Sequence, residues 1–88
     1  MPTRNDAALW ASLIKLSSDS TQTLQAQIRQ AIVSAILDRQ IASSLPLPSC
    51  RILADKLGVA RGTVVLAFQQ LVDQGFLIAR ERRGHFVN

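Results

Sequence analysis

The chain has 88 residues, a net charge of +4 and a hydrophobic fraction of 48%, which allow one small folded domain and argue against intrinsic disorder. One cysteine and no tyrosine exclude a disulfide framework and a cysteine-rich zinc site, and disfavour a base-stacking platform for single strands. No apolar run approaches the roughly 18 residues of a membrane-spanning helix, and no signal peptide follows Met1, so a cytoplasmic location is expected.

The positive charge is concentrated in the second half of the chain. Residues 51–88 contain six basic and three acidic side chains, a net charge of +3, whereas residues 1–50 contain four basic and three acidic ones. A basic half on a short domain suggests an anionic partner such as nucleic acid. A solubilising surface is the alternative that charge alone leaves open.

The first expected helix is short and amphipathic. Asp6 can cap it, and its apolar stripe is formed by Leu9, Trp10, Leu13 and Ile14. The polar residues 17–21 then end it. This stripe can pack on the rest of the domain, on a second copy of the chain or on another domain, and the sequence does not choose between them.

A second, longer helix is expected from about Thr23 to Arg39, because apolar side chains recur there at intervals of three and four residues. These side chains are Leu24, Ile28, Ala31, Ile32, Ala35 and Ile36. Pro46 and Pro48 exclude a helix after it and push Leu45 and Leu47 toward extended conformations.

Two helices joined by a tight turn are expected next. Ser49 is the predicted N-cap of the first and Gly58 its left-handed end; the second begins at Arg61 or Gly62 and stops before Gly75. Their predicted buried residues are Ile52, Leu53, Ala54 and Leu57 on the first, and Val64, Ala67, Phe68, Leu71 and Val72 on the second. This pattern predicts a helix-turn-helix.

The end of the chain has the pattern of a β-hairpin. Residues 76–79 favour a strand, residues 80–83 are polar, and Gly84 precedes a second short strand over residues 85–87. The predicted fold class is therefore mainly α with a small β-hairpin, a winged helix-turn-helix. We expect residues 1–21 to form a short N-terminal helix and connecting segment, and residues 22–88 to form the winged helix-turn-helix domain.

The sequence from Leu47 to Val64, LPSCRILADKLGVARGTV, resembles the GntR-family pattern LPSxRxLAxxLGVSRxTV. The similarity continues to the final GHFV, which resembles the family's GxGTFV wing, and residues 64–72 look most like the MocR subgroup. In that subgroup a similar domain precedes a large aminotransferase-like domain that binds pyridoxal phosphate; this chain does not contain such a domain. The resemblance implies sequence-specific binding of double-stranded DNA by the N-terminal domain of a dimeric transcriptional regulator.

Several positions depart from the family pattern. Arg39 and Ser44 stand where the family usually has glycine, and Thr23-Leu24-Gln25 stands where Pro-Leu-Tyr is frequent. Ala60 replaces a serine, which removes a helix cap and a phosphate donor. Arg82 replaces the wing-tip glycine; it adds positive charge but can disfavour a tight approach to the minor groove.

The expected DNA contacts begin at the predicted recognition helix, about residues 61–74, which would enter the major groove. Arg61 can reach guanine O6 and N7 or a phosphate, Gly62 allows close approach, and Thr63 offers a hydroxyl and a free N–H. At the start of the preceding helix, the predicted cap Ser49 is a further candidate contact, and Arg51 matches a family arginine that contacts DNA. An arginine in a first helical turn opposes the helix dipole, which an anionic partner would offset; an ion pair with Asp55 is the alternative.

Further contacts are expected along the recognition helix and at the wing. Val65 can touch a thymine methyl, and Gln69 can reach DNA only where the helix lies along the groove. The wing, about residues 80–85, is suited to the adjacent minor groove or to phosphates. Its candidate residues are Arg80, Arg82, Arg83, Gly84 and His85. The alternative for them is a solvated turn.

No catalytic or metal-binding set is visible in the sequence, so we do not expect an enzyme. There is no carboxylate pair, Ser/His/Asp set or glycine-rich phosphate loop, and a single histidine excludes a histidine cluster. Cys50 lies where the helix N-terminus and Arg51 favour a thiolate, yet we interpret it as incidental. The alternative function is a protein-interaction module in which Val65 and Leu66 face a partner protein, although nearby arginines disfavour it.

Overall fold

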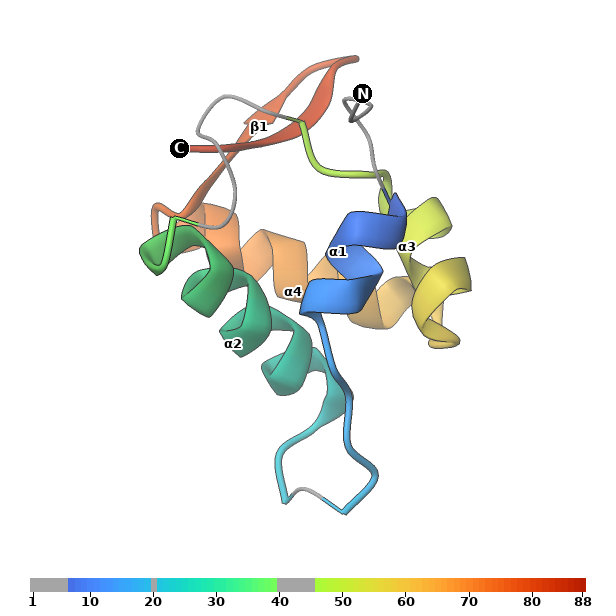
Figure 1. Cartoon of the computed structure of the whole chain (residues 1–88). Coiled ribbons are helices and arrows are strands. Elements are labelled where there is room, and N and C mark those ends of the chain that lie inside the picture. The colour runs from blue at the N-terminus through green and yellow to red at the C-terminus, as the bar shows by residue number, and fades with distance from the viewer. Residues whose placement is uncertain (1–6, 20, 40–45) are drawn as a thin grey trace.

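The structure is a computed structural model that describes residues 7–19, 21–39 and 46–88. Its elements are α1 (Ala7–Leu13), α2 (Leu24–Leu37), α3 (Cys50–Leu57), α4 (Arg61–Asp73), β1 (Leu77–Arg80) and β2 (Gly84–Val87). Figure 1 shows the helices packed together beneath the β1–β2 hairpin. The expected winged helix-turn-helix is thus confirmed. Asp6, Ser44 and Leu45 lie outside the described residues.

Helix α4 is the centre of the hydrophobic core. It packs against α2, α3 and β1, and its Phe68 side chain is completely buried. Trp10 and Ile14 are each only 3% exposed and belong to the same core, and Leu13 packs against it, so most of the stripe of the first helix packs on this domain, whereas Leu9 is 41% exposed. The sequence left open whether this stripe packs on the rest of the domain, on a second copy or on another domain. The structure shows packing on the rest of the domain.

Two residues expected in the core lie at the surface instead. Ile52 is 47% exposed and Leu24 is 41% exposed. Helix α3 buries Leu53 and Ala54, and Ile52 is turned about 100° away from Leu53 around the helix axis. Leu24 is the first residue of α2, one turn before the buried stripe begins at Ile28.

Two helices begin with a side-chain cap, and of these the sequence predicted Ser49 but not Thr23. The Oγ1 of Thr23 accepts a hydrogen bond from the Ala26 N–H at 3.1 Å, and the Oγ of Ser49 accepts one from the Ile52 N–H at 3.2 Å. Helix α2 ends at Leu37, two residues before the predicted end, because Arg39 has a left-handed φ of 57°. Helix α4 begins after Ala60, which provides no side-chain cap.

The missing cap at α4 leads to a stability prediction. Ala60 already has the extended backbone of an N-cap residue, with φ −66° and ψ 142°. We expect Ala60→Ser to raise the free energy of unfolding by about 1 kcal/mol, because a serine hydroxyl can accept from an N–H of the first turn. The melting temperature of a domain this size should rise by roughly 4–8 °C.

Ser49→Ala is the matched comparison, because it removes the cap that α3 already has. It should lower the free energy of unfolding by about the same amount. Thermal unfolding of both variants checks the prediction, and an Ala60→Ser protein that melts at or below the wild-type temperature would contradict it.

The wing is a three-segment structure. Strands β1 and β2 pair antiparallel from Leu77 opposite Val87 to Arg80 opposite Gly84. The segment before α3 joins the other edge of β2: Pro46 forms a bridge with Phe86, and the Leu47 N–H donates to the His85 carbonyl at 2.8 Å. This pairing holds the start of α3 beside the wing.

Within the described residues, none of the helices has both the length and the apolar character needed to cross a membrane.

Candidate nucleic-acid interface

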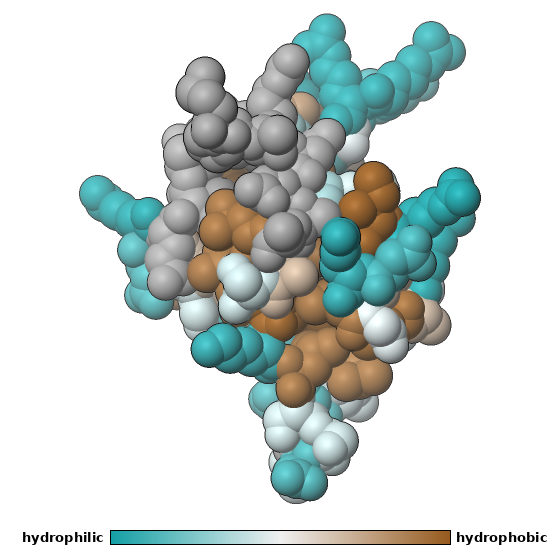
Figure 2. Space-filling view, turned by 45° about the vertical axis from the view of Figure 1, so that its right-hand side comes forward, coloured by the Kyte–Doolittle hydropathy of each residue, from teal (hydrophilic) through white to brown (hydrophobic). Residues whose placement is uncertain are grey.

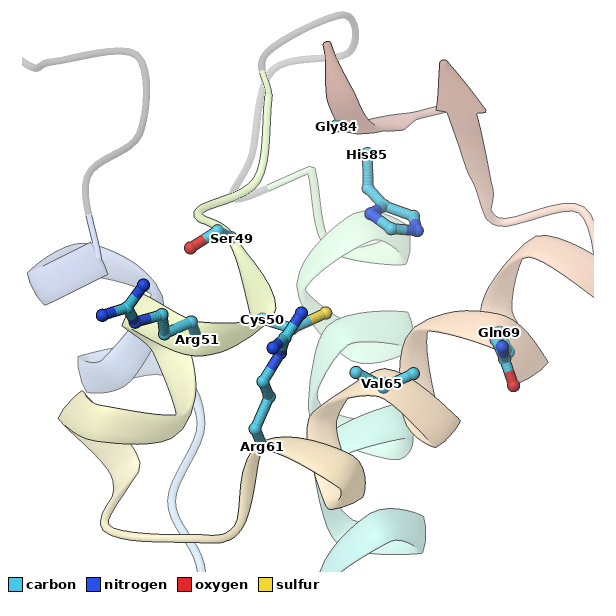
Figure 3. A pocket seen from close by; sticks show the side chains of 8 residues that line it. All are labelled: Ser49, Cys50, Arg51, Arg61, Val65, Gln69, Gly84 and His85. Carbon is cyan, nitrogen blue, oxygen red and sulfur yellow. The ribbon is translucent and has the colours of Figure 1, made fainter. Parts of the chain in front are cut away.

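A groove of about 530 Å³ lies between the start of α3, the exposed side of α4 and the wing. Its lining residues are Ser49, Cys50, Arg51, Arg61, Val65, Gln69, Gly84 and His85. Figure 3 shows them arriving from three directions, with His85 reaching from the wing toward α4. Six of the predicted DNA-binding residues therefore meet at one surface, although they are up to 36 positions apart in the sequence.

The cationic side of the groove comes from the starts of two helices. Arg51 is in the first turn of α3 and Arg61 is the first residue of α4, and both are exposed. In the part of the chain that the structure describes, neither guanidinium has an ion-pair partner; the alternative pairing of Arg51 with Asp55 is not formed. The N-terminal ends of both helices add partial positive charge, so this side of the groove favours an anion.

Gly62 and Thr63 are in the first turn of α4 but do not line the groove. Gly62 is exposed, and a Cβ built on it would meet nothing within 4 Å. The chain itself therefore gives no packing reason for a glycine at this helical position, where glycine costs roughly 1 kcal/mol relative to alanine. A glycine here leaves open space, which would allow a partner to approach the start of α4 closely.

One expectation for Thr63 is wrong. Its N–H is not free, because it donates to the Ala60 carbonyl at 3.1 Å as the helix begins with a tight turn. The Thr63 hydroxyl, on a half-buried side chain, makes no hydrogen bond to any described residue and stays available to a partner. Only the hydroxyl is therefore kept as the candidate donor.

The three wing arginines lie apart from the groove. Arg80 ends β1, and Arg82 and Arg83 form the turn, closed by a 3.0 Å hydrogen bond from the Arg83 N–H to the Arg80 carbonyl. All three are exposed. Figure 2 shows hydrophilic side chains projecting from the top of the molecule, where Figure 1 places the hairpin turn. The wing thus extends the positive charge beyond the groove.

Arg82 has a left-handed backbone, with φ 65°. A side chain in this conformation costs roughly 1–2 kcal/mol, which explains why the related pattern has glycine there. We expect Arg82→Gly to raise the free energy of unfolding by about 0.5–1 kcal/mol and to weaken duplex DNA binding, lowering the salt slope by about 1.

Arg82→Lys separates the two effects, because it keeps both the charge and the strained backbone. It should match the wild type in chemical unfolding and nearly match it in DNA affinity. An Arg82→Gly protein that binds duplex DNA with unchanged affinity and salt dependence would show that the wing tip does not contact DNA.

The environment of Cys50 corrects another expectation. Burial raises the pKa of the Cys50 thiol, and this effect outweighs the lowering by the Arg61 guanidinium and by a backbone hydrogen bond. The thiolate is therefore disfavoured, and the nearby cation that acts on it is Arg61 rather than Arg51. Figure 3 shows the sulfur beside the Arg61 side chain.

His85 connects the wing to the recognition helix. Its ring packs edge-on against Phe68, with ring centroids 4.9 Å apart and an interplanar angle of 68°. Burial lowers the pKa of His85 and so favours the neutral ring. Its edge in the groove can face a partner while its body holds the hairpin against α4.

Sequence reasoning gave too little weight to two lining residues, Cys50 and Gln69. For Gln69 a signal was present, because Arg61, Val65 and Gln69 are spaced four residues apart and so share one side of a helix. For Cys50 the only signal was its position beside the Ser49 cap.

Helices α3 and α4 both begin at the groove with an exposed arginine in the first turn, and an arginine-rich hairpin lies beside them. These features define a winged helix-turn-helix DNA-binding domain. Among the residues described, no group of three or more His, Cys, Asp or Glu side chains could hold a metal ion. The sequence model of the bacterial regulatory proteins of the gntR family matches residues 24–87. The chain belongs to the GntR family.

Curated relatives agree with this membership. Over 66 residues the chain is 44% identical to the HTH-type transcriptional regulator TauR of Rhodobacter capsulatus. The aligned region covers 75% of this chain and 14% of TauR. Over 75 residues it is 28% identical to the probable rhizopine catabolism regulatory protein MocR of Rhizobium meliloti. That aligned region covers 85% of this chain and 15% of MocR. The chain thus spans about one seventh of the length of these relatives.

Solved structures share the fold. YtrA from Sulfolobus acidocaldarius, a GntR-family transcription factor, superposes with a TM-score of 0.82 at 36% identity, covering 86% of this chain and 80% of that one. The DNA-binding domain of AraR, solved in complex with the operator ORE1, has a TM-score of 0.72 at 31% identity. The superposition covers 84% of this chain and 90% of the AraR domain.

Proposed function

We propose that this chain binds double-stranded DNA sequence-specifically as the DNA-binding domain of a transcriptional regulator. Helix α4 enters the major groove, and the wing lies at the adjacent minor groove or its phosphates. The observation that carries this is the groove in which Arg51 and Arg61 are exposed and have no ion-pair partner in the described chain. The AraR domain, which has the same fold and was solved in complex with an operator, supports duplex DNA as the partner.

The test is a selection of bound sequences from random duplex DNA, followed by affinity measurements across a salt series. We expect enrichment of a defined site and a steep loss of affinity with salt, because Lys and Arg side chains that meet phosphates release counterions. Failure to select a sequence, together with capture of a protein through exposed Leu66, would favour the protein-interaction module instead.

The finer assignment to the MocR subgroup is also our proposal. It is supported by the resemblance of residues 64–72 and by the match to MocR at 28% identity. In a protein of that subgroup pyridoxal phosphate binds an aminotransferase-like domain, so we assign no residue of this chain to it. We further propose a cytoplasmic homodimer on paired half-sites, which binding to duplexes with one and two half-sites would test.

A further inference from the structure

Arg61, Val65 and Gln69 form one stripe along the groove side of α4, as Figure 3 shows. At 1.5 Å per residue, Gln69 is about 12 Å beyond Arg61 along the helix axis. That length corresponds to roughly three to four base pairs at 3.4 Å each. A duplex that meets Arg61 with α4 along its major groove therefore also passes Gln69.

The Gln69 amide has both donor and acceptor groups open. It is exposed, and its side chain makes no hydrogen bond to any described residue. Gln27 hydrogen-bonds to Ser17 and Gln22, and Gln74 accepts from Arg29. Gln25 and Gln70 have no side-chain hydrogen bond to a described residue either, but only Gln69 among these glutamines lines the groove. The open amide thus faces the groove without an internal partner.

The stripe has a defined end. Asp73, one turn after Gln69, lines an adjoining cavity of about 400 Å³, which shares Gln69 and His85 with the groove. A carboxylate there repels phosphates, so the reading surface of α4 stops at Gln69. One turn before Gln69, the half-buried Val65 offers an apolar contact.

We propose that Gln69 is a specificity-determining residue that reads an adenine in the major groove, three to four base pairs from the base met by Arg61. A glutamine amide can pair with adenine N6 and N7, and Val65 can contact a thymine methyl between the two positions. This inference rests on the proposed function, because it requires α4 to lie in the major groove.

The experiment compares sequence selections by the whole 88-residue chain and two variants, Gln69→Ala and Gln70→Ala. Gln70 is the matched control, since it is an exposed glutamine on the same helix that lines neither cavity. We expect Gln69→Ala to lose about tenfold of the preference for adenine at one position, within the range for a bidentate base contact. Gln70→Ala should keep the wild-type preferences, and Gln69→Arg should shift the position toward guanine.

The outcomes separate this inference from the proposed function. A wild-type chain that selects a defined site while Gln69→Ala selects the same site with the same preferences overturns the role of Gln69 only. The role of Gln69 is also overturned if Gln70→Ala changes the selected site as much as Gln69→Ala does. A wild-type chain that selects no site overturns both.

Discussion

Replacing Arg61 by alanine should weaken binding to the selected duplex by roughly 5- to 150-fold and blur the preference at one base pair. This range corresponds to about 1–3 kcal/mol for a bidentate arginine contact to guanine. Arg61 is exposed at the start of α4, lines the groove and has no ion-pair partner among the described residues, so its removal should leave folding intact. Affinity at fixed salt and a repeated sequence selection measure the two effects.

Lys56→Ala is the control for this prediction. Lys56 is an exposed cation in the last turn of α3 and does not line the groove. Its removal should change affinity by much less than the loss of Arg61. Equal losses in the two variants would mean that only net charge matters, and unchanged binding by Arg61→Ala would refute the docking.

Replacing Gly62 by alanine should separate stability from function. A Cβ at this exposed helical position meets no protein atom, so the free energy of unfolding should rise by about 0.5–1 kcal/mol. DNA affinity should fall by about fivefold or more, the factor equivalent to roughly 1 kcal/mol, because the methyl group occupies space that the DNA backbone needs. Chemical unfolding and duplex titration of the same preparation check both parts.

Gly58→Ala provides the contrast, since Gly58 ends α3 with a left-handed φ of 70°. It should destabilise the domain by about 1 kcal/mol for that reason. A Gly62→Ala protein that is stabilised and binds DNA as tightly as the wild type would remove the functional reason for this glycine.

The sequence was sufficient to predict the order of the elements and most of the core. Caps such as Ser49, the left-handed Gly58 and the spacing from Val64 to Leu71 are local signals, and local signals set helix bounds. Ile52 was assigned to the core wrongly because the sequence does not show which side of a short helix faces its neighbours. The wing's third segment, at Pro46 and Leu47, depends on a pairing with β2 about 40 residues away.

The sequence predicted many of the residues of the candidate site but not how they are arranged in space. Arg51 and Arg61 could be named from their places at helix starts, but not their meeting with His85 at one groove. The Thr63 N–H and the Cys50 thiol were misjudged because hydrogen bonding and burial, which the sequence does not show, decide their state.

The most direct test of the account is to titrate the isotopically labelled chain with its selected duplex and to follow the backbone amide signals by NMR. We predict the largest shifts in three groups, residues 49–51, residues 61–69 and residues 80–85, with small changes in α2. Shifts concentrated on α2, with the groove residues unchanged, would contradict the claim that this groove and wing hold DNA.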